Sequence, residues 1–213
     1  MRGSARPRCT LCIHETWADA MSRRATLSIL LIVAAALAGL GVVAALSRRN
    51  TITPIGIVFH HTSWLPSVKG QTLPTIPRTP SDERTWQEYH GQRGFGAFYW
   101  GRIYHLGYHY MILPDGTLKR GRPEHCIGAH TKGFNNYLGI VLVGDFSSRD
   151  NPDGSKGLPQ PTSQQLRTLV SLCRQLQARY HFPVSRIVRH SDLERTLCPG
   201  DRFPFQEVLT QLQ

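Results

Sequence analysis

The chain has 213 residues, a length that fits one globular domain with additional segments. It carries 25 Lys and Arg against 14 Asp and Glu, a formal net charge of +11, which favours an anionic partner such as nucleic acid, a lipid surface or a cell-wall polymer. No run of Lys and Arg and no interleaving of basic with aromatic residues is found, so we expect no nucleic-acid partner. The composition leaves the oligomeric state open.

Residues 25–46 form an uncharged apolar stretch. As a helix, its 22 residues rise about 33 Å, which is enough to cross a bilayer core of roughly 30 Å. We therefore predict a single transmembrane helix that anchors the protein in the cell membrane. The alternative is a cleaved signal peptide, with small residues for cleavage at 43–45, but the apolar stretch is longer than a typical signal core of about 7–15 residues.

The arginines around this stretch predict its orientation. Two follow it, Arg48 and Arg49, and five precede it: Arg2, Arg6, Arg8, Arg23 and Arg24. Since basic residues favour the cytoplasmic side, we expect residues 1–24 to form a cytoplasmic tail and the rest of the chain to lie on the periplasmic or cell-wall side. If the signal were cleaved, that part would be secreted. Met21 is an alternative start of translation, because the sequence after it reads as a complete export signal.

The first half of the exported part shows two regular elements. Residues 47–54 are expected to be a linker, and residues 56–60, GIVFH, a buried strand. Four prolines in 64–80 predict a surface loop, and a helix is expected over 81–90, where a serine can cap it and acids occupy its first turn. Residues 91–101 combine glycines with aromatic residues, which predicts a loop with an apolar surface, either the wall of a groove or a membrane contact.

The second half of the exported part alternates strands with helices. Strands are expected over 108–113, 117–120, 138–146 and 187–190, with a turn at 114–116 and a loop at 148–161. One helix opens with the capping box Thr162-Ser163-Gln164-Gln165, and a last helix covers about 204–212. This alternation predicts an α/β fold, a mixed central β-sheet flanked by helices, preceded by the N-terminal transmembrane helix.

The chain has five cysteines with different surroundings. Cys9 and Cys12 form a lone Cys-x-x-Cys, which is a poor zinc site without a second pair. Cys173 lies on the apolar face of the helix that follows residue 162, so we expect it to be a buried core thiol. The exported part holds three cysteines, an odd number, so at least one thiol stays unpaired within the chain.

Cys198 is the cysteine that can share a functional site with histidines. His190 precedes it by eight residues, and His60 ends the first predicted strand. Two histidines and one cysteine, with a fourth position open to water, form a known catalytic zinc pattern, and a metal would hold the thiol as a thiolate. A Cys198–His190 nucleophile pair, as in a cysteine-dependent peptidase, is the alternative. Against it, Pro199 lacks the backbone N–H that often stabilises an oxyanion next to a nucleophilic cysteine.

Five segments resemble a known family in their order and spacing. They are HHT at 60–62, GYHYMILPDGTLKRGR at 107–122, IGAHTKGFNN at 127–136, LGIVLVGDF at 138–146 and RHSDLERTLCPGD at 189–201. Over about residues 55–212 the chain resembles the zinc-dependent N-acetylmuramoyl-L-alanine amidases of the type-2 amidase and peptidoglycan-recognition-protein superfamily. The resemblance implies that superfamily's fold, with residues 55–213 as the zinc amidase domain.

The resemblance also implies roles for individual residues. It makes His60, His190 and Cys198 the ligands of a Zn²⁺ ion. It makes Tyr108 a catalytic or transition-state residue, with Thr196 at the position where some members of the family carry a catalytic lysine. The segment between His60 and Tyr108 is longer than in phage members of the family, which puts the shape of the groove and the substrate preference in doubt.

The activity implied is hydrolysis, by a zinc-activated water, of the amide bond between N-acetylmuramic acid and L-alanine, so the expected partners are peptidoglycan or muropeptides. His109, His130 and Asn136 are candidates for substrate binding, and a purely structural role is the alternative for each. A module that binds muropeptides without cleaving them is the main alternative function.

Overall fold

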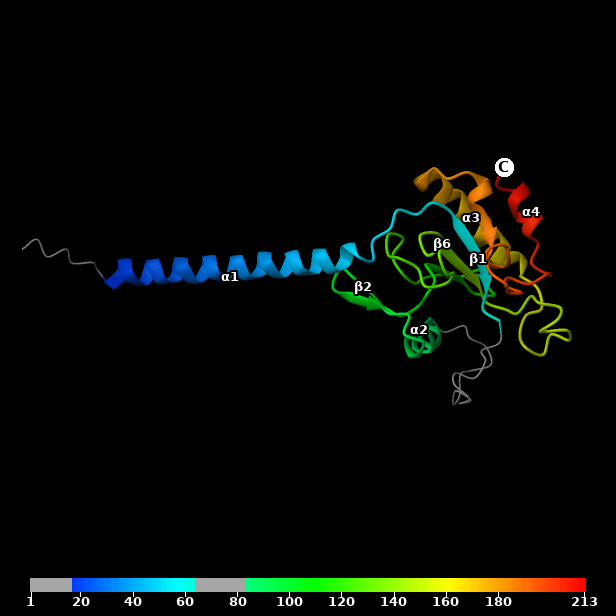
Figure 1. Ribbon diagram of the computed structural model, residues 1–213, viewed down its shortest axis with the longest axis horizontal. Coiled ribbons are helices and arrows are strands. Elements are labelled where there is room, and N and C mark those ends of the chain that lie inside the picture. The colour runs from blue at the N-terminus through cyan, green and yellow to red at the C-terminus, as the bar shows by residue number, and fades with distance from the viewer. Residues whose placement is uncertain (1–16, 64–82) are drawn as a thin grey trace, which may run out of the picture. The chain divides into compact units, whose positions relative to one another are not determined.

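The computed structural model describes residues 17–63 and 83–213 (Figure 1). The expected proline-rich loop over 64–80 lies outside the described residues, as do Cys9, Cys12 and most of the expected cytoplasmic tail. The chain divides into two compact units, residues 1–45 and residues 46–213. We describe each unit by itself.

The first unit is one long helix, α1 (Trp17–Arg48), whose last residues belong to the second unit. The stretch Met21–Arg48 is long and apolar enough to cross a membrane, and none of its most apolar window is buried within the protein. Leu31 and Ile32 are 70% and 68% exposed. An exposed helix that is apolar on all sides is typical of a membrane span. The expected helix is present and is longer than predicted at both ends, and its crossing of a membrane stays a prediction.

The second unit is built on a five-stranded sheet with the strand order β5-β4-β6-β1-β7. Its parallel core consists of β6 (Leu138–Leu142), β1 (Ile57–His61) and β7 (Ile187–Arg189), with β1 in the middle. Next to β6, on the side away from β1, β4 (Tyr110–Ile112) is parallel to β6. The edge strand β5 (Leu118–Arg120) is antiparallel to β4. The predicted mixed sheet is confirmed.

The remaining elements surround this sheet. They are α2 (Glu83–Gln92), a separate hairpin of β2 (Ala97–Tyr99) and β3 (Arg102–Tyr104), α3 (Ser163–Tyr180), α4 (Phe205–Thr210) and two 3₁₀ turns, Val184–Arg186 and His190–Asp192. In Figure 1, α3 and α4 lie on one side of β1 and β6, and α2 lies on the other.

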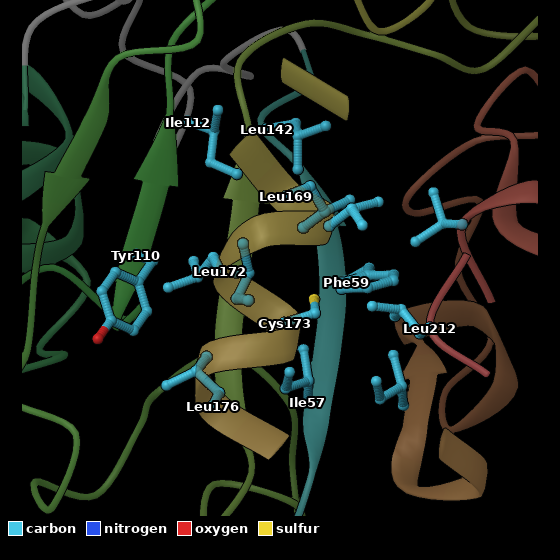
Figure 2. Packing of buried hydrophobic residues seen from close by; sticks show 14 of the residues in the cluster. Ile57, Phe59, Tyr110, Ile112, Leu142, Leu169, Leu172, Cys173, Leu176 and Leu212 are labelled. Atoms are coloured by element: carbon cyan, nitrogen blue, oxygen red, sulfur yellow. The ribbon is translucent and has the colours of Figure 1, made fainter. Parts of the chain in front are cut away.

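Alternation along the strands sorts the buried side chains into two layers. The larger cluster lies under α3 and α4, where Ile57 and Phe59 of β1 meet Leu169, Cys173 and Leu176 of α3 (Figure 2). The smaller cluster joins α2 to the opposite face of the sheet and contains Trp86, Tyr89, Leu106, Met111, Leu113, Val141 and Val143. The predicted core position of Cys173 is confirmed, since this residue has no exposed surface.

The start of α3 has the capping box that the sequence predicts. The Thr162 hydroxyl accepts from the N–H of Gln165, while the Gln165 side chain accepts from the N–H of Thr162. The same buried amide donates to the carbonyl oxygens of Ile112 and Val143, at 3.1 and 3.0 Å. Gln165 therefore fastens the helix to the ends of two strands.

Two expectations about strands and loops need correction. The strand predicted over 138–146 ends at Leu142, because Val143, Gly144 and Asp145 each donate to a different partner: the Ile112 carbonyl, the Thr62 hydroxyl and the Leu158 carbonyl. The predicted loop over 91–101 contains β2.

The expected linker over 47–54 is part of the folded unit. Ile52 donates to the His125 carbonyl at 2.8 Å, Ile127 donates to the Asn50 carbonyl at 2.7 Å, and Thr51 pairs with Cys126 in an isolated antiparallel bridge. No local sequence pattern predicts these pairs, because the partners lie more than 70 positions away along the chain.

Leu169→Ala should destabilise the second unit by about 2–5 kcal/mol, because it leaves a cavity among fully buried neighbours. Urea unfolding of residues 46–213 measures the loss. Gln175→Ala, on the exposed face of the same helix, is the matched control and should change stability by less than about 0.5 kcal/mol. Equal effects of the two substitutions would contradict the assignment of the core.

Candidate active site

The alternation of side chains along β1 decides which of the two adjacent histidines faces the α2 side of the sheet. Since neighbouring residues of a strand point to opposite faces, His61 lies on the same side as Phe59, 5.8 Å from the Phe146 ring, whereas His60 points to the other side. His61 is engaged there: its Nδ1 accepts from the N–H of Phe146 and lies 3.7 Å from Asp145 Oδ1. His60 is left as the histidine of the site.

His60 and His190 are brought together by strand register. Parallel pairing of β1 with β7 places Phe59 beside Arg189, so the next residue of each strand follows at the same edge of the sheet. The two imidazole centroids lie 4.6 Å apart. Cys198 returns to this edge through the loop after the 3₁₀ turn, where the N–H of Ser191 donates to its carbonyl at 2.8 Å.

His60, His190 and Cys198 form a compact donor cluster. One ligand atom from each lies within 4.8 Å of the others, and His60 Nδ1 is 3.6 Å from Cys198 Sγ. Zinc–nitrogen and zinc–sulfur bonds of about 2.0–2.1 and 2.3 Å at a tetrahedral angle separate the two ligand atoms by about 3.5 Å. The spacing and the donor set therefore fit zinc.

A chain of hydrogen bonds fixes the tautomer of His60. His130 Nε2 lies 3.1 Å from the carbonyl oxygen of Tyr137, which can only accept, so the His130 proton is on Nε2. The bare Nδ1 of His130 is then the acceptor for His60 Nε2, and the Thr131 hydroxyl lies beside the same nitrogen, both at 3.1 Å. This leaves the lone pair of His60 Nδ1 facing Cys198 Sγ, as a metal ligand requires.

Burial keeps these imidazoles neutral. It lowers the pKa of His60 well below its usual value, with further lowering by His130 and His190, and it lowers the pKa of His130 to about 3. Burial also lowers the pKa of His190, although Glu194 opposes the shift. Neutral imidazole is the form that binds metals.

Burial has the opposite consequence for metal binding at the Cys198 thiol, because it disfavours the thiolate that binds a metal. Burial raises its pKa to about 12, and the N–H of His61, which donates to Sγ at 3.4 Å, only partly offsets this. A thiolate here requires a cation beside it, and the described neighbours supply none. A thiol that reacts as a nucleophile needs a lowered pKa, so the environment favours a metal ligand over the nucleophile pair.

His190 is held by Glu194. Its buried Nε2 lies 3.3 Å from Glu194 Oε2 in an ion-pair geometry. Glu194 also accepts from the N–H of Lys132, on the segment that carries His130. The Glu194 carboxylate thus joins two walls of the site.

Two cavities meet at Tyr108, whose ring centroid lies 5.0 Å from that of His60. One, of about 420 Å³, extends over His130 and His190, and the other, of about 410 Å³, extends toward Asp145. Burial raises the pKa of Tyr108 above its ordinary value, with Cys198 adding to the shift, so the phenol stays protonated and available as a donor.

His90 and Arg93 line both cavities and were not identified from the sequence. His90 ends the buried face of α2, four residues after Trp86, and its Nδ1 accepts from the N–H of Gly107 at 2.9 Å. Burial lowers its pKa to about 4. In the sequence, the helical spacing of this histidine after a tryptophan and a tyrosine predicts that it lies on the buried face of the helix. It does not predict that this face borders a site.

Two of the predicted substrate contacts, His109 and Asn136, lie outside the residues that line the two cavities. His109 is fully buried, and both of its ring nitrogens bind backbone groups, the Cys126 carbonyl and the N–H of Gly139. Asn136 does not line either cavity, whereas its neighbour Asn135 does. Asn135 Oδ1 accepts from the N–H groups of His130 and Thr131, so this amide shapes the turn below the groove.

The other predicted site residues lie at the groove or in its loop. His130 lines the larger cavity and holds His60. The Thr196 hydroxyl accepts from the N–H of Cys198 at 3.2 Å, which places this side chain in the loop that presents the thiol.

Comparison with known proteins shows the family of this chain. The family model of N-acetylmuramoyl-L-alanine amidases matches residues 48–201. The chain belongs to the N-acetylmuramoyl-L-alanine amidase family. The matched range begins inside the segment expected to be a linker, consistent with the pairing of residues 50–52 in the fold.

Individual relatives of this amidase domain include phage, animal and bacterial proteins. The endolysin of Escherichia phage T7 is 35% identical over 96 residues, which are 45% of this chain and 59% of the endolysin. The N-acetylmuramoyl-L-alanine amidase of Homo sapiens is 30% identical over 151 residues, 70% of this chain and 23% of that protein. The solved endolysin amidase LysCS of Clostridium intestinale superposes with a TM-score of 0.58 at 31% identity, covering 76% of this chain and 84% of that one.

His130→Ala should lower the affinity for zinc by roughly 10–100-fold, because His60 loses the acceptor that fixes its tautomer and ring orientation. Competition titration against a chromophoric chelator measures the affinity. His125→Ala, at an exposed histidine outside both cavities, is the matched control and should leave it unchanged. An unchanged affinity in His130→Ala would contradict the proposed hydrogen-bond chain.

Zinc binding near pH 8 should release about one proton, because the Cys198 thiol is protonated there while the histidines are already neutral. Since the thiol pKa lies above this range, affinity should rise about tenfold per pH unit between pH 6.5 and 8. Calorimetry in buffers of different ionisation enthalpy counts the protons. Release of none would show that Cys198 is a thiolate before the metal arrives.

Proposed function

We propose that this protein hydrolyses the amide bond between N-acetylmuramic acid and L-alanine in peptidoglycan, using zinc held by His60, His190 and Cys198. The observation that carries the proposal is the convergence of these three donors, at zinc spacing, beside the Tyr108 phenol at the meeting point of two cavities. The family membership supports the same activity.

Zinc in such a site would supply a Lewis acid that polarises the amide carbonyl and lowers the pKa of a coordinated water. The residues of the chain supply orientation and hydrogen bonds. Tyr108 keeps its proton at neutral pH and donates it in a hydrogen bond to the carbonyl oxygen as negative charge builds up there. Thr196 accepts from the N–H of Cys198, so its own hydroxyl proton remains for a second hydrogen bond to that oxygen.

The walls of the groove would hold the substrate. His130, Thr131 and Asn135 line the larger cavity, and Arg93 lines both. The guanidinium of Arg93 suits the carboxylates of a peptide stem.

We further propose that residues 25–46 anchor the protein in the cell membrane and that the amidase domain faces the periplasmic or cell-wall side, where peptidoglycan lies. The support is the apolar helix and the excess of arginines before it. Residues 1–24 would then be the cytoplasmic tail, and the exported domain would begin near residue 47.

A module that binds muropeptides without cleaving them is the alternative, since the family's fold also serves recognition. A cysteine-dependent peptidase is less well supported, because burial raises the pKa of Cys198 rather than lowering it. The two alternatives and the proposal predict different products and different responses to chelators.

Incubation with peptidoglycan should release stem peptides that begin with L-alanine, and mass spectrometry identifies them. Cys198→Ser should release none and should lose the bound zinc, measured by elemental analysis, because a neutral hydroxyl is a poor zinc ligand. Zinc retention and muropeptide binding by the wild type without any release would identify a receptor. Activity that survives chelation but not thiol alkylation would identify a cysteine peptidase.

Tyr108→Phe should lower kcat by roughly 10²–10³-fold while zinc is retained, because one preorganised donor to the developing negative charge is removed. Turnover of a defined muropeptide measures the effect. Tyr104→Phe, which removes the same oxygen from a residue outside both cavities, is the control and should keep full activity. A loss confined to KM would show that Tyr108 binds substrate rather than stabilising charge.

A further inference from the structure

The β2–β3 hairpin exposes two large apolar side chains, one in its turn and one in β3. Trp100 is 61% exposed and Ile103 is 55% exposed, which makes them the most exposed large hydrophobic residues among those described in the second unit. Arg102 lies between them, with its guanidinium 4.9 Å from the centroid of the Tyr104 ring. Two large apolar side chains exposed on one small hairpin indicate a contact surface.

The backbone of the turn does not call for a tryptophan. Trp100 and Gly101 are the two central residues of the turn and have φ angles of 45° and 84°. Positive φ at both positions is the type I′ pattern, in which asparagine or glycine is strongly preferred at the first position. A tryptophan there is strained, so its side chain must serve something other than the turn.

Hydrogen bonds join the hairpin to residues 47 and 50, which lie just after the apolar stretch 25–46. The N–H of Trp100 donates to Ser47 Oγ, and Asn50 Nδ2 donates to the Phe98 carbonyl, both at 2.8 Å. Arg48 and Arg49, between these two residues, are exposed. If residues 25–46 cross the bilayer, residue 47 leaves it at the boundary between lipid and water, and the hairpin tip lies within hydrogen-bond distance of that boundary.

We propose that the hairpin is a second membrane contact, in which Trp100 and Ile103 enter the headgroup region of the outer leaflet of the membrane that the chain spans. Tryptophan is enriched at this depth, where an amphipathic ring meets both lipid and water. Arg48, Arg49 and Arg102 supply positive charge for the phosphates of anionic lipids. The inference rests on the proposed membrane anchor and is independent of amidase activity.

The contact would fix the position of the groove relative to the membrane. The hairpin connects Arg93 and Tyr108 along the chain, and both line the cavities. Phe95, just before the hairpin, accepts from the buried guanidinium of Arg122, which also donates to the carbonyls of Leu106 and Ile127. The membrane contact is thereby connected to the frame of the groove by a short, hydrogen-bonded path.

The full-length chain in vesicles of phosphatidylcholine and phosphatidylglycerol with brominated acyl chains tests the proposal, because bromine quenches tryptophan only at close range. The quenched fraction of the emission should fall in Trp100→Asn relative to the wild type. Asparagine suits the turn, so thermal unfolding of this variant should occur at the same or a higher temperature. Trp100→Asn combined with Gln175→Trp, which places an indole on the exposed face of α3, is the control and should not restore the quenching.

Equal quenching of the wild type and Trp100→Asn would overturn the proposal and leave the tip for a protein partner. Equal quenching by the added tryptophan at position 175 would also overturn it, since any part of the surface would then touch lipid. Failure of the full-length chain to sediment with the vesicles would overturn the anchor and the hairpin contact together. Muropeptide cleavage, assayed on the same samples, reports separately on the amidase proposal.

Discussion

The site depends on the parallel pairing of β1 with β6 and β7. Register places His60 next to His190 at the carboxyl edge of neighbouring strands, and alternation turns His60 away from the main core and toward α2. A shift of one residue would bring His61 to the site instead, where its contacts with Phe146 and Asp145 would be lost. The buried residues of β1 that oppose such a shift, Ile57 and Phe59, therefore also determine the position of the candidate metal ligand His60.

Around this edge, burial favours the neutral form of the imidazoles and of the thiol alike. This helps the histidines to bind a metal and hinders the cysteine. It keeps His60, His130 and His190 neutral and able to bind a metal, but it keeps the Cys198 thiol protonated. A divalent cation would resolve this conflict, because it would stabilise the thiolate that the protein alone disfavours. The same groups without a metal would form a poor nucleophile pair, so one physical cause separates the two chemistries that the donor set allows.

Much of the fold is visible in the chain itself. The uncharged stretch 25–46 is a helix, the capping box at Thr162 opens α3, and apolar residues from Leu169 to Leu176 face the sheet, because each depends on local composition or a short period. The hairpin and the pairing of residues 50–52 escaped prediction, since both depend on distant hydrogen-bond partners such as Ser47 with Trp100 and Ile52 with His125. Short strands in a glycine-rich segment carry too little periodicity to be recognised.

The sequence by itself determined the chemical types in the site, because two histidines, a cysteine and a tyrosine in family order already indicate a zinc hydrolase of this kind. Only the tertiary structure decided which residue of each neighbouring pair lies at the groove. It placed Asn135 rather than Asn136 at the groove, satisfied His109 with backbone groups, and gave His130 the task of orienting His60. It also brought His90 to the site from a separate helix. The physical reason is that side-chain direction and hydrogen-bond partners follow from packing between distant segments, which no local pattern encodes.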